Sequence, residues 1–168
     1  MAILKKTIDK ILIGTSILGR ILIIGLMGLI VYEVVARRFG FLGSIAIQEL
    51  EWHFHGALFL LCLGFTYLKD AHVRVDIFRE RFSPKTNRLI EIAGCLLFLL
   101  PYCGVVIYFG VEFTLKAYFN SEMSSAAQGL PYRWMIKSLI PIGFFLLGLS
   151  GVSILIGSST KKEGDPHG

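Results

Sequence analysis

Four long apolar stretches alternate with shorter polar segments along the chain, over about residues 11–36, 52–68, 89–111 and 135–156. A helix needs about 20 apolar residues to cross the ~30 Å hydrocarbon core of a bilayer. Each stretch is therefore predicted to be a transmembrane helix, with residues 45–50 prolonging the shorter second one into the headgroups. Barrel strands would alternate apolar and polar residues, and these stretches do not. The pattern predicts an all-α integral membrane protein with four transmembrane helices.

The polar segments define the remaining organisation. Residues 1–10 are expected to form a cytoplasmic N-terminus, 11–157 the four-helix membrane domain, and 158–168 a polar cytoplasmic tail. Between the second and third helices, Phe78 and Phe82 have helical spacing against neighbouring arginines. This spacing predicts a short amphipathic helix lying in the membrane interface. The Ser-, Ala- and Gly-rich residues 120–132 are expected to form an exposed periplasmic loop.

Basic residues are distributed unevenly between the two sides of the predicted bundle. The N-terminal segment, the loop between helices two and three, and the tail together carry eleven Lys and Arg, and the opposite side carries five. Because cytoplasmic segments are enriched in Lys and Arg, this bias predicts that both termini are cytoplasmic.

Composition narrows the class further. Hydrophobic residues make up 54% of the 168 residues and charged residues 17%, whereas soluble domains have about 25% charged residues. The formal net charge of +5 comes from basic residues that punctuate apolar runs, so an anionic lipid surface is a better counterpart than nucleic acid. Cys62, Cys95 and Cys103 all lie within apolar stretches and are expected to be buried thiols.

The densest polar cluster precedes the second apolar stretch. On a helix, Glu49 with His53 and Glu51 with His55 are pairs four residues apart, which makes a metal site conceivable. The cluster lacks the Glu-x-x-His spacing of di-iron bundles and a zinc-type ligand set. A polar periplasmic helix end, with Trp52 in the aromatic belt, is the favoured interpretation, and no metal or cofactor is expected.

Arg20 and Glu33 lie within the first apolar stretch, and charges inside a span are functional candidates by default. A structural role is favoured, because Arg20 can extend towards the cytoplasm and Glu33 can pair with Arg37 one turn later. Glu112 and Lys116 form a similar pair. The sequence contains no catalytic motif of a known type, so an enzyme is not expected. The nearly uncharged helix centres suggest an accessory subunit.

Five motifs stand out: the Ala-His-Val-Arg-Val-Asp run at 71–76, residues 51–60, Arg37-Arg38-Phe39, Gly129-Leu130-Pro131 and Ile140-Pro141-Ile142-Gly143. Together they resemble the small membrane subunit, the DctQ component, of tripartite ATP-independent periplasmic (TRAP) transporters. The resemblance covers about residues 8–157, and the run at 71–76 is its most specific part.

The resemblance implies a component of a three-part transporter in the bacterial inner membrane. A periplasmic binding protein would deliver an organic acid, a large membrane subunit with the sodium and substrate sites would transport it, and this chain would brace the large subunit. Two alternatives remain: a haem or quinone anchor of a respiratory complex, and a free-standing small exporter. His53 and His55 share one predicted helix, which is unfavourable for paired axial ligands of haem.

Two sets of contact residues are expected. The periplasmic residues are candidates for partner contacts and for docking the soluble binding protein: Arg37, Arg38, Glu49, Glu51, His53, His55 and Arg133. Five others form a candidate interfacial motif on the cytoplasmic side: His72, Arg74, Asp76, Phe78 and Phe82.

Overall fold

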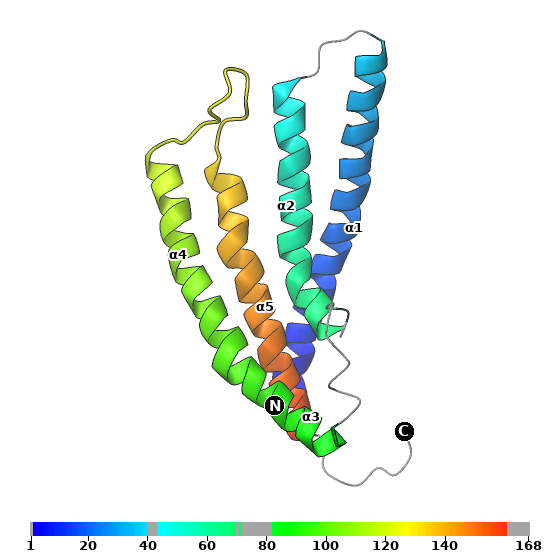
Figure 1. Cartoon of the computed structure of the whole chain (residues 1–168), viewed down its shortest axis with the longest axis vertical. Helices are drawn as coiled ribbons and strands as arrows, with labels where there is room; N and C mark the ends of the chain where they lie inside the picture. The colour runs from blue at the N-terminus through cyan, green and yellow to red at the C-terminus, as the bar shows by residue number, and fades with distance from the viewer. Residues whose placement is uncertain (1, 40–43, 70, 72–81, 161–168) are drawn as a thin grey trace.

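A computed structural model describes residues 2–39, 44–69, 71 and 82–160 of the chain. These parts contain helices and turns and no strands. In chain order the helices are α1 (Ala2–Arg38), α2 (Ile45–Leu68), α3 (Pro84–Gly94), α4 (Leu100–Phe119) and α5 (Trp134–Thr160). A π-helical turn, Cys95–Leu99, joins α3 to α4, so that the two form one bent rod (Figure 1).

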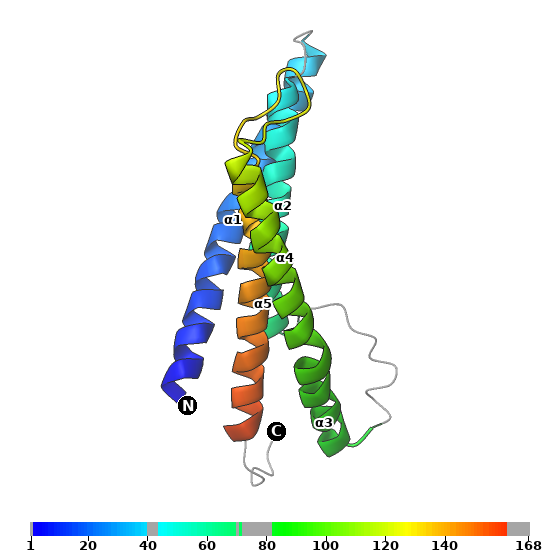
Figure 2. The ribbon, with the colours of Figure 1, turned by 90° about the vertical axis from the view of Figure 1, so that its left-hand side faces the viewer.

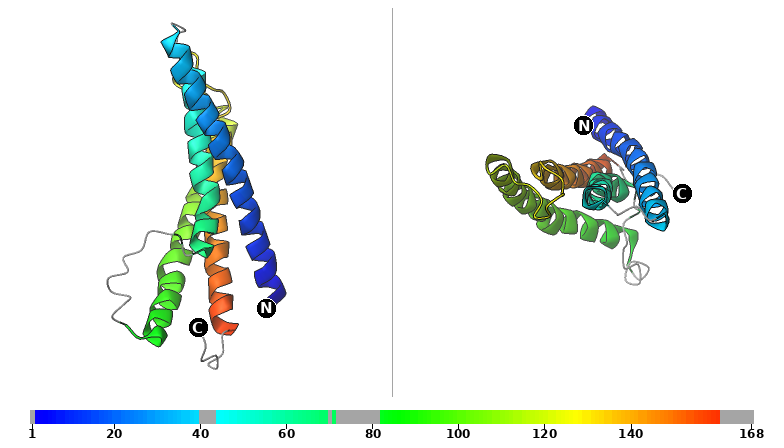
Figure 3. Two further views of the ribbon diagram at one scale, coloured as in Figure 1. Left: turned by 90° about the vertical axis from the view of Figure 1, so that its right-hand side faces the viewer. Right: turned by 90° about the horizontal axis from the view of Figure 1, so that it is seen from above.

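The long helices pack in the spatial order α1, α2, α5 and α4 (Figures 1 and 3). Two apolar clusters hold the central pair α2 and α5 to their neighbours. The first joins Leu12 of α1 to Leu146 of α5, and the second joins Leu63, Cys103 and Leu147 from α2, α4 and α5. The central helices α2 and α5 therefore position the outer helices α1 and α4.

The helices α2 and α5 approach closely at two glycines. A Cβ atom added at Gly64 would lie 2.6 Å from the carbonyl oxygen of Leu146, and one added at Gly143 would lie 2.6 Å from that of Leu60. Small residues allow such backbone contact between membrane helices, where lipid supplies no hydrophobic drive for association. These two glycines set the distance between the two central helices.

Pro101 explains the bend between α3 and α4. A proline inside a helix lacks the N–H for an intrahelical hydrogen bond, and its ring crowds the carbonyl one turn earlier. The wider π-helical turn lies directly before Pro101, with the Leu100 N–H donating to the Cys95 carbonyl. The bend separates α3 from the bundle axis (Figure 2).

The cytoplasmic loop expected over residues 69–88 is shorter than predicted, because residues 84–88 form the first turns of α3. The Ser83 hydroxyl accepts a hydrogen bond from the Thr86 N–H at 3.3 Å, and Pro84 occupies the first turn, where its missing N–H costs least. Phe82 is exposed just before this cap. The other four residues of the expected interfacial motif lie outside the described residues: His72, Arg74, Asp76 and Phe78.

The first helix begins earlier than the apolar pattern predicted. It starts at Ala2, whereas residues 1–10 were expected to be a separate polar segment. Ile8 is buried and packs in one cluster with Leu12 and Leu146, so α5 stabilises the first turns despite their lysines. At the other end of the chain, α5 continues to Thr160, and residues 161–168 of the expected tail lie outside the described residues.

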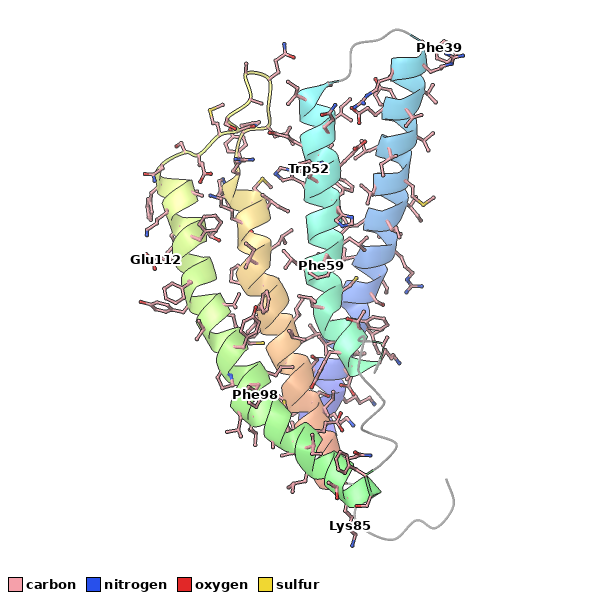
Figure 4. The ribbon with its side chains drawn as sticks, viewed as in Figure 1. Phe39, Trp52, Phe59, Lys85, Phe98 and Glu112 are labelled. Carbon is pink, nitrogen blue, oxygen red and sulfur yellow. The ribbon has the colours of Figure 1, made fainter. Side chains whose placement is uncertain are left out.

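Three helical stretches in the described parts are long and apolar enough to cross a membrane: Ile3–Arg38, Lys85–Phe119 and Trp134–Gly157. Most large apolar side chains on α1 and α4 are exposed, which suits contact with lipid or with another membrane protein. The helix α2 is not among the three, because its first turns carry the polar cluster 48–55. Phe39 and Lys85 mark opposite ends of the long molecule (Figure 4).

Candidate functional site

Distant segments come together at the end of the bundle where α1 ends and α2 and α5 begin (Figure 1). Their polar side chains are linked by hydrogen bonds and an ion pair. The connecting residues 120–133 fold back over this end. The Arg133 N–H donates to the Glu122 carbonyl at 3.2 Å, and the Ser124 N–H donates to the Leu130 carbonyl at 3.2 Å. The sequence predicted an exposed periplasmic loop over residues 120–132, and the structure adds hydrogen bonds that hold this loop in place.

Glu33 links α1 to α2. Its side chain is 9% exposed and accepts hydrogen bonds from Arg37 Nη2 at 2.5 Å and from Gln48 Nε2 at 2.8 Å. The pairing with Arg37 was predicted from sequence and is present as an ion pair. A buried carboxylate is costly without partners, and here the two donors compensate the cost of burying the Glu33 carboxylate. Glu33 therefore acts as a polar bridge between two helices.

Glu51 faces inward in the same region. Its atom Oε1 is buried without a hydrogen-bond partner among the described residues, and its side chain lies beside that of Glu33. The expected role of Glu51 in docking a soluble protein requires a carboxylate that faces outward. The structure instead places the Glu51 carboxylate between helices of this chain.

Glu49 fastens the connection between α4 and α5. Its two carboxylate oxygens accept hydrogen bonds from the Ser124 hydroxyl and, at 2.6 Å, from the Leu130 N–H. The Ser124 hydroxyl and the Leu130 amide hold the pKa of this carboxyl below its ordinary value. Glu49 was expected to contact a partner protein. Reversal of Glu49 and Glu51 to Lys was expected to weaken uptake and leave the membrane complex intact. The contacts of Glu49 add the expectation that its reversal also releases this connection.

A second clamp holds the same connection, and sequence reasoning did not identify it. Lys137 Nζ of α5 pairs with the Glu122 carboxylate and lies 3.8 Å from the ring centroid of Phe113 of α4. A cation over an aromatic ring in a half-buried site gains electrostatic attraction. The only sequence signal was a lysine in the first turn of an otherwise apolar helix.

The other predicted contact residues are spread around this end. Arg37 and Arg38 are exposed, and Arg133 is half-buried. Nδ1 of His53 contacts the Glu49 carbonyl oxygen. His55 is exposed and lines a separate cavity with Phe59 and Cys62, so the histidines point to different surroundings. The described residues contain no group of three or more His, Cys, Asp or Glu that could hold a metal ion.

Three further charged groups lie elsewhere. The exposed Glu112 and Lys116 form the predicted ion pair, with 2.7 Å between the carboxylate and the ammonium. Arg20 is exposed, and its Nε donates to the Ser16 carbonyl at 3.4 Å, one turn towards the start of α1. This orientation agrees with the expected extension of Arg20 towards that end.

Asp9 is a polar link between α1 and α5 that the sequence interpretation missed. The buried Ser153 hydroxyl donates to Asp9 Oδ1 at 2.5 Å. Thr15 and Ser150 are also buried, and each donates to a carbonyl of its own helix. These hydrogen bonds satisfy three buried hydroxyl groups of α1 and α5.

Apolar helices with exposed flanks, polar bridges inside the chain and one polar end define an α-helical membrane protein. The sequence profile of the family described as "Tripartite ATP-independent periplasmic transporters, DctQ component" matches residues 26–160. The chain therefore belongs to the DctQ family of TRAP transporter small permease subunits, as the motifs indicated. This is a family of transporter components, not of enzymes. A comparison with curated protein sequences gave no significant match.

Proposed function

We propose that this chain is a scaffold subunit that braces the large membrane subunit of its transporter in the bacterial inner membrane. The transporter would take up an organic acid, delivered by a periplasmic binding protein, with sodium entry as the driving force. The sodium and substrate sites would lie in the large subunit. The family match over residues 26–160 carries this proposal, since it extends over most of the helical bundle.

The exposed apolar flanks support a bracing role. Phe98 and Phe109 on the bent outer rod and Ile24 on α1 are among many large apolar side chains that this chain leaves uncovered. Charged side chains in the described part of the bundle are largely engaged in contacts within the chain or lie near helix ends. A substrate-binding subunit needs polar ligands or broken helices near the membrane midplane. Such surfaces are better suited to permanent contact with another membrane protein than to substrate binding.

The helix α2 is proposed to be the fourth membrane span. It packs along both α1 and α5, so a bilayer that contains those helices also surrounds the apolar part of α2. With four spans, the start of α1 and the end of α5 lie on the same side, as in Figure 1. The bias in basic residues assigns that side to the cytoplasm, and the polar end of the bundle then faces the periplasm.

Labelling of single cysteines tests this topology. Ser83 and Ser125 are both exposed and lie at opposite ends of the molecule. In a background without the three native cysteines, a membrane-impermeant maleimide added to intact cells should label Ser125→Cys and not Ser83→Cys. Both should react after permeabilisation, which is the control. Labelling of Ser83→Cys alone in intact cells would reverse the topology.

The proposed docking face for the binding protein is narrower than the sequence suggested. The exposed Arg37 and Arg38 remain candidates and the exposed Tyr132 joins them, whereas Glu49 and Glu51 face other parts of the chain. Charges at such a rim would act mainly on the encounter rate and its salt dependence. Substitution of Arg38 by glutamine should therefore slow association without dissociating the membrane complex, whereas Arg37 also compensates the buried Glu33 carboxylate and is left in place.

Co-purification tests the bracing role. When the tagged chain is expressed with the large TRAP subunit of the same organism, the two should elute together from a mild detergent as one species. A tagged membrane protein of similar size from another family serves as the control. Elution of the chain alone would contradict the proposal, and a Soret band in the purified chain would favour the haem-anchor alternative.

A further inference from the structure

A groove of about 610 Å³ lies between α1 and α2 on the outer side of the bundle. Its walls are mostly apolar and include Ile13 and Ile23 of α1 and Leu58 and Phe65 of α2. Both isoleucines are exposed to nearly half of their surface. The groove thus opens outward at the depth of the apolar helices, where a bilayer would supply hydrocarbon chains.

Gly19 gives the groove its depth. A Cβ atom at Gly19 would lie 2.4 Å from Sγ of Cys62 and 3.4 Å from a methyl carbon of Leu58. Because α1 has no side chain at this point, the two helices touch and the adjacent side chains form walls around the contact. The groove is therefore narrow, apolar and suited to an extended alkyl chain.

Two cations, Arg20 and Lys69, line the same groove. Both are exposed, and within the described parts of the chain neither pairs with a carboxylate. Arg20 leans towards the start of α1 through its contact with the Ser16 carbonyl, and Lys69 directly follows the end of α2. Both side chains are thus associated with the end of the groove that the proposed topology assigns to the cytoplasm.

Two cations beside an apolar groove, without a carboxylate partner among the described residues, call for an anion that carries alkyl chains. A charge within the membrane region is costly unless it finds a counter-charge, and an anionic phosphodiester supplies one. A zwitterionic lipid offers the same alkyl chains but adds its own cation, which opposes the two that are present. The charge pattern therefore selects for the headgroup and the apolar walls accept the chain.

We propose that this groove binds one anionic glycerophospholipid of the cytoplasmic leaflet. Its phosphate would lie between Arg20 and Lys69, and one acyl chain would run past Gly19 towards Ile23 and Leu58. The proposal depends on the proposed topology and not on the transport role. It assigns Arg20, a charge within the first apolar stretch, a ligand.

Native mass spectrometry of the complex of this chain with its large subunit, after delipidation, tests the proposal. The complex is titrated with phosphatidylglycerol and with phosphatidylcholine of identical acyl chains. The wild type should retain phosphatidylglycerol preferentially. Arg20→Gln/Lys69→Gln should weaken phosphatidylglycerol binding about 30-fold, the scale expected for two basic residues near an anionic lipid. Lys69→Gln alone, at an exposed helix end, should weaken binding about fivefold and covers the case in which the double variant does not fold.

The matched control is Lys6→Gln/Lys10→Gln, which removes the same charge from exposed positions on α1 outside the groove. It should keep the preference. Equal losses in both double variants, or equal binding of the two lipids by the wild type, would overturn the proposal.

Competition by millimolar inorganic phosphate would reveal a soluble-anion site instead of a lipid site. Loss of lipid binding only when the large subunit is present would show that the groove is a subunit interface. Because headgroup selectivity is read in detergent, a wrong topology would be detected separately, by the cysteine labelling.

Discussion

Gly143→Leu is expected to prevent α2 and α5 from packing and to abolish the folded bundle. A Cβ at this position would lie 2.6 Å from the carbonyl oxygen of Leu60 and 3.0 Å from its carbonyl carbon. Both are backbone atoms, so no side-chain rotation relieves the clash and the helices must separate. Overpacking in a well-packed core typically lowers the free energy of unfolding by about 1–3 kcal/mol. A clash with backbone atoms is expected to lower it by at least the upper value of that range. The yield of monodisperse complex and its thermal unfolding in mild detergent measure the effect.

Gly28→Leu is the matched control for this substitution. It adds the same side chain to an apolar membrane helix, but a Cβ at Gly28 meets no atom within 4 Å beyond its chain neighbours and the surrounding backbone of its own helix. Unfolding of this variant should resemble that of the wild type. If Gly143→Leu also unfolds like the wild type, the close approach of α2 and α5 at the two glycines does not hold the bundle together.

Glu49→Gln is expected to release the connection between α4 and α5 while leaving the helices folded. The substitution weakens two charge-assisted hydrogen bonds, from the Ser124 hydroxyl and the Leu130 amide. The Leu130 amide should then exchange with solvent about tenfold faster or more, because its local protection depends on this acceptor. Hydrogen exchange read by mass spectrometry across residues 120–133 provides the measurement.

The pH dependence of the same contact has a defined sign. The loop lowers the pKa of Glu49, so its contribution to stability is fully present above the ordinary carboxyl pKa of about 4.3. This contribution should be lost as the pH falls further, through the lowered pKa of Glu49.

Glu112→Gln is the control for Glu49→Gln in the exchange experiment, because it breaks an exposed ion pair that holds no loop. Unchanged protection of Leu130 in Glu49→Gln would refute the anchoring role.

The sequence predicted the features of this molecule that depend on local pattern. Apolar runs located the long helices, and the spacing of four residues located the Glu33–Arg37 and Glu112–Lys116 pairs. Helix ends were less predictable, because burial of Ile8 against α5 decides where α1 begins. The third helical segment extends back to residue 84 for a local reason, because the Ser83 hydroxyl caps α3 and Pro84 occupies its first turn.

Contacts between distant segments could not be predicted in this way. Glu49 lies 75 residues from Ser124 in the chain, and Asp9 lies 144 residues from Ser153. The Glu49 carboxylate was interpreted as a docking charge, because its position at a helix end is compatible both with docking a partner and with anchoring a loop of its own chain. Only the packing of α2 against α5, which brings the connection over residue 49, distinguishes them.

The most direct test of the scaffold role is sodium-driven uptake in proteoliposomes. The large subunit and the binding protein are reconstituted with or without this chain, and uptake is followed with a radiolabelled organic acid that the binding protein retains. Uptake should require all three proteins and an inward sodium gradient, and calorimetry on this chain alone should show no saturable heat with the same acid. Full uptake by the large subunit and the binding protein without this chain would contradict the account.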